Sequence, residues 1–147
     1  MYKHILVATD GSRLSGKAVA HAIALAHALG AKLTAFYASL EYPMPAYADG
    51  VVYDPISRKE YAEICKKEAG KVLDPIALKA KAARVAFDGA HAISPAPWEA
   101  ILAAARKNKC DMIVMASHGR RGVSALLLGS ETQKVLAHSK LPLLVVR

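Results

Sequence analysis

The residues best suited to chemistry lie in a segment rich in glycine and serine near the end of the chain. Residues 117–130 include Gly119, Gly129 and Ser130, and Gln133 follows Ser130 by three positions. This spacing is the capping-box pattern, which predicts that Ser130 caps a helix whose first backbone N–H groups stay free. Such amides attract phosphate, and a glycine lets an anion approach the backbone closely. The segment therefore predicts a phosphate site to which the Ser130 hydroxyl contributes.

Charged neighbours could add to this site. Gly119 offers a second close approach to the backbone, and His118, Arg120 and Arg121 could supply charge or hydrogen bonds. The alternative is an ordinary strand-to-helix connection whose glycines serve turns and whose arginines face water. The patterns GxxxxGK[ST] and GxGxxG are absent from the sequence, which excludes ordinary P-loop catalysis and dinucleotide binding.

The first half of the chain alternates short apolar runs with helical patterns. His4 to Ala8 predicts a buried strand that enters a polar turn. Apolar residues at three- and four-residue steps then predict a helix that stops at Gly30 in left-handed geometry, and Lys32 to Ala38 predicts a second strand. Ser39 to Pro55 breaks both periodicities, which predicts a long surface excursion.

The second half continues the same alternation. Ser57 to Lys79 predicts a helix that Pro75 should end or kink near Asp74. Ala83 to Phe87 predicts a third strand, followed by an irregular segment over Asp88 to Pro97. The next predictions are a helix with the inner face Trp98, Ile101, Leu102 and Ala105, a strand over Asp111 to Ala116, a helix over Glu131 to His138 and a closing strand over Leu141 to Val146.

These elements predict one α/β domain over residues 1–147, because the chain has material for one core but not for two. Strands separated by helices close into a doubly wound parallel sheet with helices on both faces. For five strands in the order 3-2-1-4-5, ligands are expected where the loops after strands one and four diverge. Those loops, Thr9 to Leu14 and Ser117 to Ser130, are the most unusual segments of the sequence.

At these segments the chain resembles a universal stress protein of the ATP-binding type, over essentially its whole length. The nucleotide motif of that family is G-x2-G-x9-G-[ST], and Ala116, Gly119 and Gly129-Ser130 stand at its positions. The opening Ile5 to Ser12, the segment Asp111 to Gly119 and the ending Pro142 to Val146 also resemble the family. Ala116 replaces the first glycine of the motif, and we expect an extended backbone there to tolerate the extra methyl group.

The resemblance implies a role for each motif position. Asp10 would lie against the ribose, the backbone of Ala38 would contact adenine, and Gly119, Gly129 and Ser130 would hold the phosphates. Equally, Asp10 could be a turn carboxylate and Ser12 only a helix cap. The cofactor is expected to be ATP, with Mg²⁺ arriving on the triphosphate. The full set of expected nucleotide-binding residues is Thr9, Asp10, Ser12, Ala38, Ala116, His118, Gly119, Arg120, Gly129, Ser130 and Glu131.

Composition limits the ligands and the cellular compartment expected for this chain. Twenty Lys and Arg against twelve Asp and Glu give a net charge of +8, which favours anionic ligands. The start of the chain predicts no export signal, no apolar run approaches the ~20 residues of a membrane span, and the two cysteines form no CxxC pair. We therefore expect a cytoplasmic protein with reduced thiols. The histidines show no metal-ligand spacing, so no site built from protein ligands alone is expected.

The last strand is apolar and is expected at the sheet edge, where a second copy is the simplest cover. Family resemblance likewise implies a homodimer through this strand. The leading function is a nucleotide-binding sensor or regulator of a stress response with an unknown protein partner. A slow ATPase and a basic nucleic-acid-binding module are the alternatives, although the latter lacks a stacking surface. Adenylating enzymes of the SGGxDS type and phospho-acceptor receiver domains lack their motifs here.

Overall fold

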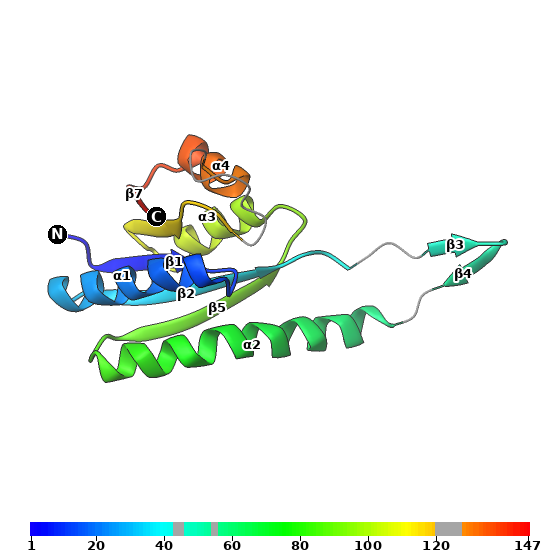
Figure 1. Cartoon of the computed structure of the whole chain (residues 1–147), viewed down its shortest axis with the longest axis horizontal. Helices are drawn as coiled ribbons and strands as arrows, with labels where there is room; N and C mark the ends of the chain where they lie inside the picture. The colour runs from blue at the N-terminus through cyan, green and yellow to red at the C-terminus, as the bar shows by residue number, and fades with distance from the viewer. Residues whose placement is uncertain (43–45, 54–55, 120–127) are drawn as a thin grey trace.

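The computed structural model describes residues 1–42, 46–53, 56–119 and 128–147. Strands and helices alternate along the chain, and a short hairpin interrupts them once (Figure 1). The elements are β1 (His4–Ala8), α1 (Arg13–Leu29), β2 (Lys32–Ser39), β3 (Ala46–Ala48), β4 (Val51–Tyr53), α2 (Arg58–Ala82), β5 (Phe87–Ile93), α3 (Pro97–Lys107), β6 (Met112–Ala116), α4 (Ser130–His138) and β7 (Leu143–Val146).

The main sheet has five parallel strands in the order β5-β2-β1-β6-β7. This is the order 3-2-1-4-5 when only its own strands are counted, so the predicted doubly wound fold is confirmed. The central strand β1 pairs with β2 through Ala8 and Phe36, and with β6 through Val7 and Val114. The switch point therefore lies between β1 and β6, as predicted.

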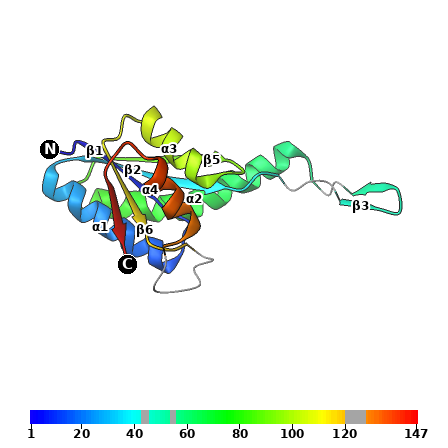
Figure 2. The same cartoon turned by 90° about the horizontal axis from the view of Figure 1, so that it is seen from above.

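Helices cover both faces of the sheet, with α3 and α4 on one face and α1 and α2 on the other (Figures 1 and 2). The first core cluster joins α1 and α2 to residues such as Val7 and Leu33, and the second joins α3 and α4 to Leu6 and Ile113. Neighbouring residues of one strand thus point into different clusters, as the pleat of a buried strand requires.

Local chemistry sets the limits of α1. The Ser12 side chain accepts a hydrogen bond from the Ser15 backbone N–H at 3.2 Å, so Ser12 is the N-cap. Gly30 ends the helix at φ +61°, the left-handed geometry predicted from its position. A cap at Ser12 fixes the path of the loop that leaves β1.

Helix α2 does not end at Pro75, so the first of the two expected effects of the proline, an end or a kink, is wrong. It runs from Arg58 to Ala82 and buries Ile76 and Ala80 beyond the proline. Proline removes one helical hydrogen bond, but packing of these side chains against the sheet outweighs that loss. Propensity was overruled here by tertiary burial.

The third strand of the sheet is also shifted from its predicted place. Ala83 to Phe87 was expected as the strand and Asp88 to Pro97 as an irregular segment, whereas β5 spans Phe87–Ile93. The α2 helix instead continues to Ala82, and Arg84 turns the chain at φ +56°. Strand β5 is at the edge of the sheet, and its residues are only partly buried or exposed. It therefore carries polar residues, and these interrupt the continuous apolar run by which a buried strand is recognised in a sequence.

The predicted excursion over Ser39 to Pro55 contains regular structure that the sequence analysis missed. Strands β3 and β4 pair antiparallel across Asp49 and Gly50, which have φ of +50° and +75°. An Asp-Gly pair with positive φ at both positions is a strong hairpin signal. Figure 1 draws this hairpin beyond the ends of the main sheet and of α2.

Candidate functional site

A cavity of about 750 Å³ lies at the carboxyl ends of β1, β2 and β6. This volume is in the range of small-molecule sites. The loops after β1 and β6, the start of α3 and the start of α4 form its rim, and α2 closes its far side. The cavity therefore stands at the predicted switch point.

The loop after β1 is held by a chain of short hydrogen bonds. Thr9 N–H donates to the Phe36 carbonyl at 2.9 Å, and the Thr9 hydroxyl lies 3.0 Å from the Ser15 hydroxyl. Asp10 Oδ1 accepts from Ser12 N–H at 2.9 Å. Thr9 and Asp10 therefore reach the cavity wall in a fixed turn, whereas Ser12 is engaged in capping α1.

Helix α4 begins with backbone amides that no side chain in the described part of the chain caps, and these are called its open amides. Gly129 rather than Ser130 is its N-cap, no side chain of the described residues caps it, and its first internal bond runs from Gln133 N–H to the Gly129 carbonyl at 3.0 Å. The predicted capping box is therefore wrong: the Gln133 side chain donates instead to the Leu128 carbonyl at 2.6 Å. Ser130 is the first helical residue, and its exposed side chain lines the cavity.

The first turn of α4 is anchored to the sheet by a residue that the sequence analysis did not select. The buried Thr132 hydroxyl donates to the Ala116 carbonyl at 3.0 Å. Gly129 N–H donates to the Ser117 carbonyl at 2.7 Å. A Cβ at position 129 would stand 3.3 Å from the backbone of Ser117 and of His118. The glycine is needed where two backbone segments meet.

Gly119 and Asp10 face each other across the switch point. A Cβ on Gly119 would lie 2.7 Å from Asp10 Oδ2, a distance that real Cβ atoms essentially never show. The loops after β1 and β6 therefore meet here with no room for a side chain. The packing of the two loops therefore requires a glycine at position 119 even when no ligand is bound.

His118 contributes a buried polar atom beside the same loop. Its Nδ1 lies 3.0 Å from the Ser117 hydroxyl. Among the described residues, His118 Nε2 is the one buried side-chain nitrogen or oxygen without a hydrogen-bond partner. Such an atom is costly unless a ligand or water completes it.

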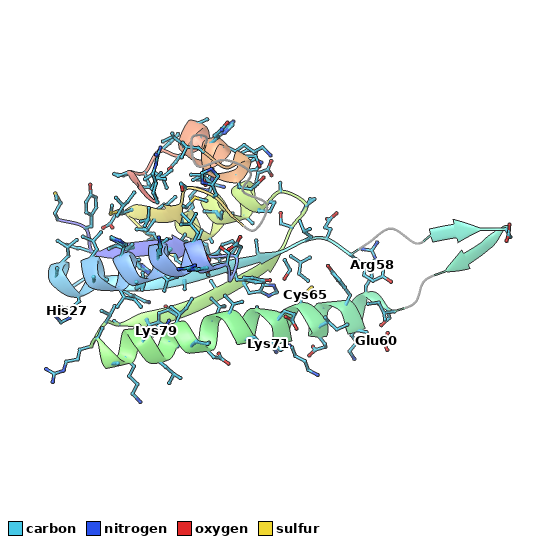
Figure 3. The ribbon with its side chains drawn as sticks, in the orientation of Figure 1. His27, Arg58, Glu60, Cys65, Lys71 and Lys79 are labelled. Atoms are coloured by element: carbon cyan, nitrogen blue, oxygen red, sulfur yellow. The ribbon has the colours of Figure 1, made fainter. Side chains whose placement is uncertain are left out.

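The other end of the cavity is apolar. Phe36, Ala38, Met115, Pro97 and Ile101 contribute to its wall. A second group, from β2 and α2, was not foreseen from the sequence and consists of Tyr37, Ser39, Leu40, Tyr61, Ile64, Cys65 and Glu68. Figure 3 shows Cys65 on the side of α2 that faces the sheet, with Lys71 pointing away from it.

The tyrosine on α2 is tied to the end of β2. Tyr61 Oη donates to the Leu40 carbonyl at 2.9 Å, and its ring meets that of Tyr42 edge-on at 5.2 Å. Burial, with a smaller contribution from Cys65, raises the pKa of the Tyr61 phenol. The side chain thus acts as a neutral donor and wall of the cavity.

The backbone groups of Ala38 face the β1 side of β2. The Phe36 carbonyl accepts from Thr9, so Phe36 faces β1, while the Ser39 carbonyl accepts from Ser94 and faces the β5 side. Alternation along the strand makes Ala38 face the β1 side, where β1 has already ended at Ala8. Its N–H and C=O are directed to the space beyond that strand.

The structure brings most of the predicted residues to one cavity. Its wall includes Thr9, Asp10, Ala38, Ala116, His118, Gly119, Gly129, Ser130 and Glu131. Ser12 stands behind the wall as the cap of α1. Arg120 and Arg121 lie outside the described residues. Within the described part of the chain, no group of three or more His, Cys, Asp or Glu side chains is arranged to hold a metal ion.

Comparison with known proteins places the chain in a family. The Universal stress protein family model matches residues 1–147. A universal stress protein of Thermus aquaticus is 38% identical, with 100% of both chains covered. The chain therefore belongs to the universal stress protein family.

Solved structures agree with this assignment. The structure of the protein MJ0577, whose biochemical function was assigned from its structure, has a TM-score of 0.79 and 25% identity, with 99% of this chain and 96% of that chain covered. A universal stress protein in complex with cAMP has a TM-score of 0.70 and 27% identity, with 99% and 97% covered. Among the described residues, no helix is both long and apolar enough to span a bilayer.

Proposed function

We propose that this chain binds an adenine nucleotide, ATP in the first instance, and acts as a sensor or regulator in a stress response. The observation that carries the proposal is the uncapped start of α4, which opens on the cavity beside Gly119 and His118. The complex of a family member with cAMP supports the choice of an adenine nucleotide.

The phosphates would lie at the start of α4. No described residue caps the amides of residues 130–132 with its side chain, and the helix dipole adds positive potential there. Ser130 adds an exposed hydroxyl, and the unpartnered His118 Nε2 gives a phosphate oxygen a further neighbour. These polar groups suit the anionic oxygens of a phosphate chain better than they suit an apolar ligand.

The nucleoside would occupy the opposite part of the cavity. The apolar wall of Phe36, Met115 and Ile101 suits the faces of a purine, and the free edge of the Ala38 backbone offers one donor and one acceptor to its polar edge. Asp10, between the two ends, would accept from a ribose hydroxyl.

Magnesium would enter with the triphosphate, because phosphate oxygens supply most of its ligands in such sites. Bound nucleotide would then act by changing shape or the choice of partner. Slow hydrolysis is the alternative outcome, and it would be recognised as magnesium-dependent phosphate release that Gly119→Ala abolishes in folded protein.

The direct experiment starts with the purified protein. Denaturation and chromatography of the released small molecules should yield an adenylate. Calorimetric titration of stripped protein with ATP, AMP, cAMP and GTP should then show adenylates binding at least about tenfold more tightly than GTP. A folded protein that binds no adenylate would remove the proposal. Nucleic-acid binding that persists in excess ATP would favour the basic-module alternative.

Homodimerisation through β7 belongs to the same proposal. Strand β7 is at the sheet edge, and its Pro142 and Val146 carbonyls face β6, so Leu143 and Val145 direct their backbone groups outward. Val145→Pro should remove one outward N–H while leaving the bonds to β6. Sedimentation velocity should show a dimer for the parent protein and a monomer for the variant; a parent that sediments as a monomer contradicts this part.

A cytoplasmic location is the compartment we propose, supported by two buried cysteines that are both free thiols. Fractionation of cells that express the protein should recover it with cytosolic markers.

A further inference from the structure

We propose that Glu131 is a positioning residue that joins the phosphate end of the cavity to its base end, rather than a ligand of the nucleotide. The proposal rests on the function proposed above. Glu131 is in the first turn of α4, directly after Ser130, but its Oε2 accepts a hydrogen bond from the Trp98 backbone N–H at 2.8 Å. Trp98 is in the first turn of α3, so one side chain spans the two helices.

Within residues 1–42, 46–53, 56–119 and 128–147, no other side chain caps helix α3. Its N-cap is Ala96, which carries no acceptor, and Pro97 occupies the first helical position. Trp98 N–H is therefore among the first amides that a helix must satisfy from outside itself. The carboxylate of Glu131 does this across the gap between helices, and its negative charge also complements the dipole of α3.

Both oxygens of this carboxylate are already occupied. Oε2 accepts from Trp98, and Oε1 accepts from Lys134 Nζ at 3.2 Å, one turn further along α4. A ribose hydroxyl or a magnesium ion would have to displace one of these donors. Glu131 thus lines the cavity, but both of its carboxylate oxygens bind protein donors.

The link matters because both helices line the cavity. Pro97 and Ile101 of α3 form part of the apolar end, while Ser130 of α4 stands at the phosphate end. Thr132 fixes the same turn of α4 to β6 through the Ala116 carbonyl at 3.0 Å. Two consecutive side chains therefore set α4 against α3 and against the sheet, and the spacing of the two ends of the cavity follows from them.

The charge of Glu131 separates its two effects. The Glu131 carboxylate lies beside the open amides at the start of α4, so its negative charge repels a bound phosphate. At the same time its Oε2 keeps α3 in place through the bond to Trp98. Glu131→Gln retains an acceptor for Trp98 and removes the charge. Glu131→Ala removes both, so the two substitutions should move nucleotide affinity in opposite directions.

The experiment measures affinity for adenosine, AMP and ATP by calorimetry, and hydrogen exchange of the Trp98 amide by NMR without ligand. Glu131→Ala should speed that exchange at least about tenfold and weaken adenosine binding by about tenfold, and ATP binding by about threefold because the loss of the charge offsets part of the effect. Glu131→Gln should keep the exchange near the parent rate and bind ATP about threefold more tightly, with little change for adenosine. Glu99→Gln is the control, because Glu99 is an exposed acid in the first turn of α3 without this bond.

Two results would overturn the proposal. The first is Trp98 exchange in Glu131→Ala that equals the parent rate. The second is an affinity loss confined to phosphorylated ligands and shared by Glu131→Gln, which would make Glu131 a ligand. The exchange experiment needs no nucleotide. A parent protein that fails to bind adenylates would therefore remove the proposed function, whereas the exchange rates would still test the contact between α4 and α3.

Discussion

The carboxylate of Asp10 occupies the space that any side chain at position 119 would need. A Cβ on Gly119 would lie 2.7 Å from Asp10 Oδ2. The two residues come from loops that are more than a hundred positions apart in the sequence, and they meet only because β1 and β6 are neighbours in the sheet. The position of the Asp10 carboxylate therefore depends on the absence of a side chain at position 119.

Gly119→Ala should force Asp10 from its place and weaken ATP binding by about tenfold or more, while the sheet remains intact. The physical reason is the steric overlap with Oδ2, which must move before the methyl group fits. Calorimetry measures the affinity and circular dichroism checks the fold. Gly16→Ala is the matched control, since a Cβ there meets nothing within 4 Å and helix propensity favours alanine by ~1 kcal/mol. Equal ATP affinities for the two variants would refute the steric argument.

Thr132→Val should lower the free energy of unfolding by about 1–3 kcal/mol, because it leaves the Ala116 carbonyl without its buried partner and keeps the side-chain shape. Urea unfolding monitored by far-UV circular dichroism gives this value. Thr132→Ser keeps the hydroxyl and should retain ATP affinity better than the valine variant. If valine costs no stability and no affinity, the anchor between α4 and β6 has no energetic role.

His91 should make stability depend on pH below neutrality. Burial lowers the pKa of its imidazole, and Nε2 lies 2.9 Å from the Ser39 hydroxyl. The unfolded chain then binds more protons than the folded one between the ordinary value of 6.5 and the lowered folded value. Stability is full above pH 6.5 and falls as pH drops through that window.

The test compares urea unfolding at several pH values for the parent and His91→Gln. The variant should lose less stability on acidification than the parent does. Because burial and Lys32 also lower the pKa of His4, that residue supplies a similar slope which remains in the variant. Identical pH profiles for both proteins would contradict the role of His91.

Cys110 should resist alkylation in the folded protein. Burial raises the pKa of its thiol to about 11, with a contribution from Asp111, so the reactive thiolate is scarce at neutral pH. Mass spectrometry after iodoacetamide treatment should find residue 110 modified only after denaturation. The same rate in folded and unfolded protein would show that the thiol is not protected.

Much of the architecture was predictable because continuous apolar runs such as Ile5 to Ala8 and Met112 to Ala116 mark strands that are buried on both faces. The edge strand β5 was misplaced since Asp88 and His91 give it a mixed pattern. Pro75 was given too much weight, because a local propensity cannot report the burial of Ile76.

The geometry of the candidate site was predictable where it depends on the backbone. Gly119 and Gly129 were identified from their spacing, and each stands where another chain segment comes within contact distance. The contacts of Ser130, Gln133 and Glu131 were not, because the capping-box pattern is local and the partner of Glu131 is in a different helix. An acid at the second position of one helix gives no signal in the sequence that it caps another.

The measurement that tests the account most directly is the change in backbone amide NMR signals when nucleotide is added. If the start of α4 holds the phosphates, ATP should shift the amide signals of Gly119 and residues 129–132 most, and AMP should shift the signals of residues 129–132 less. Inorganic triphosphate should shift the amide signals of residues 129–132 but not those around Ala38. Shifts confined to other surfaces, or none at saturating ATP, would contradict the claim that the open start of α4 holds the phosphates.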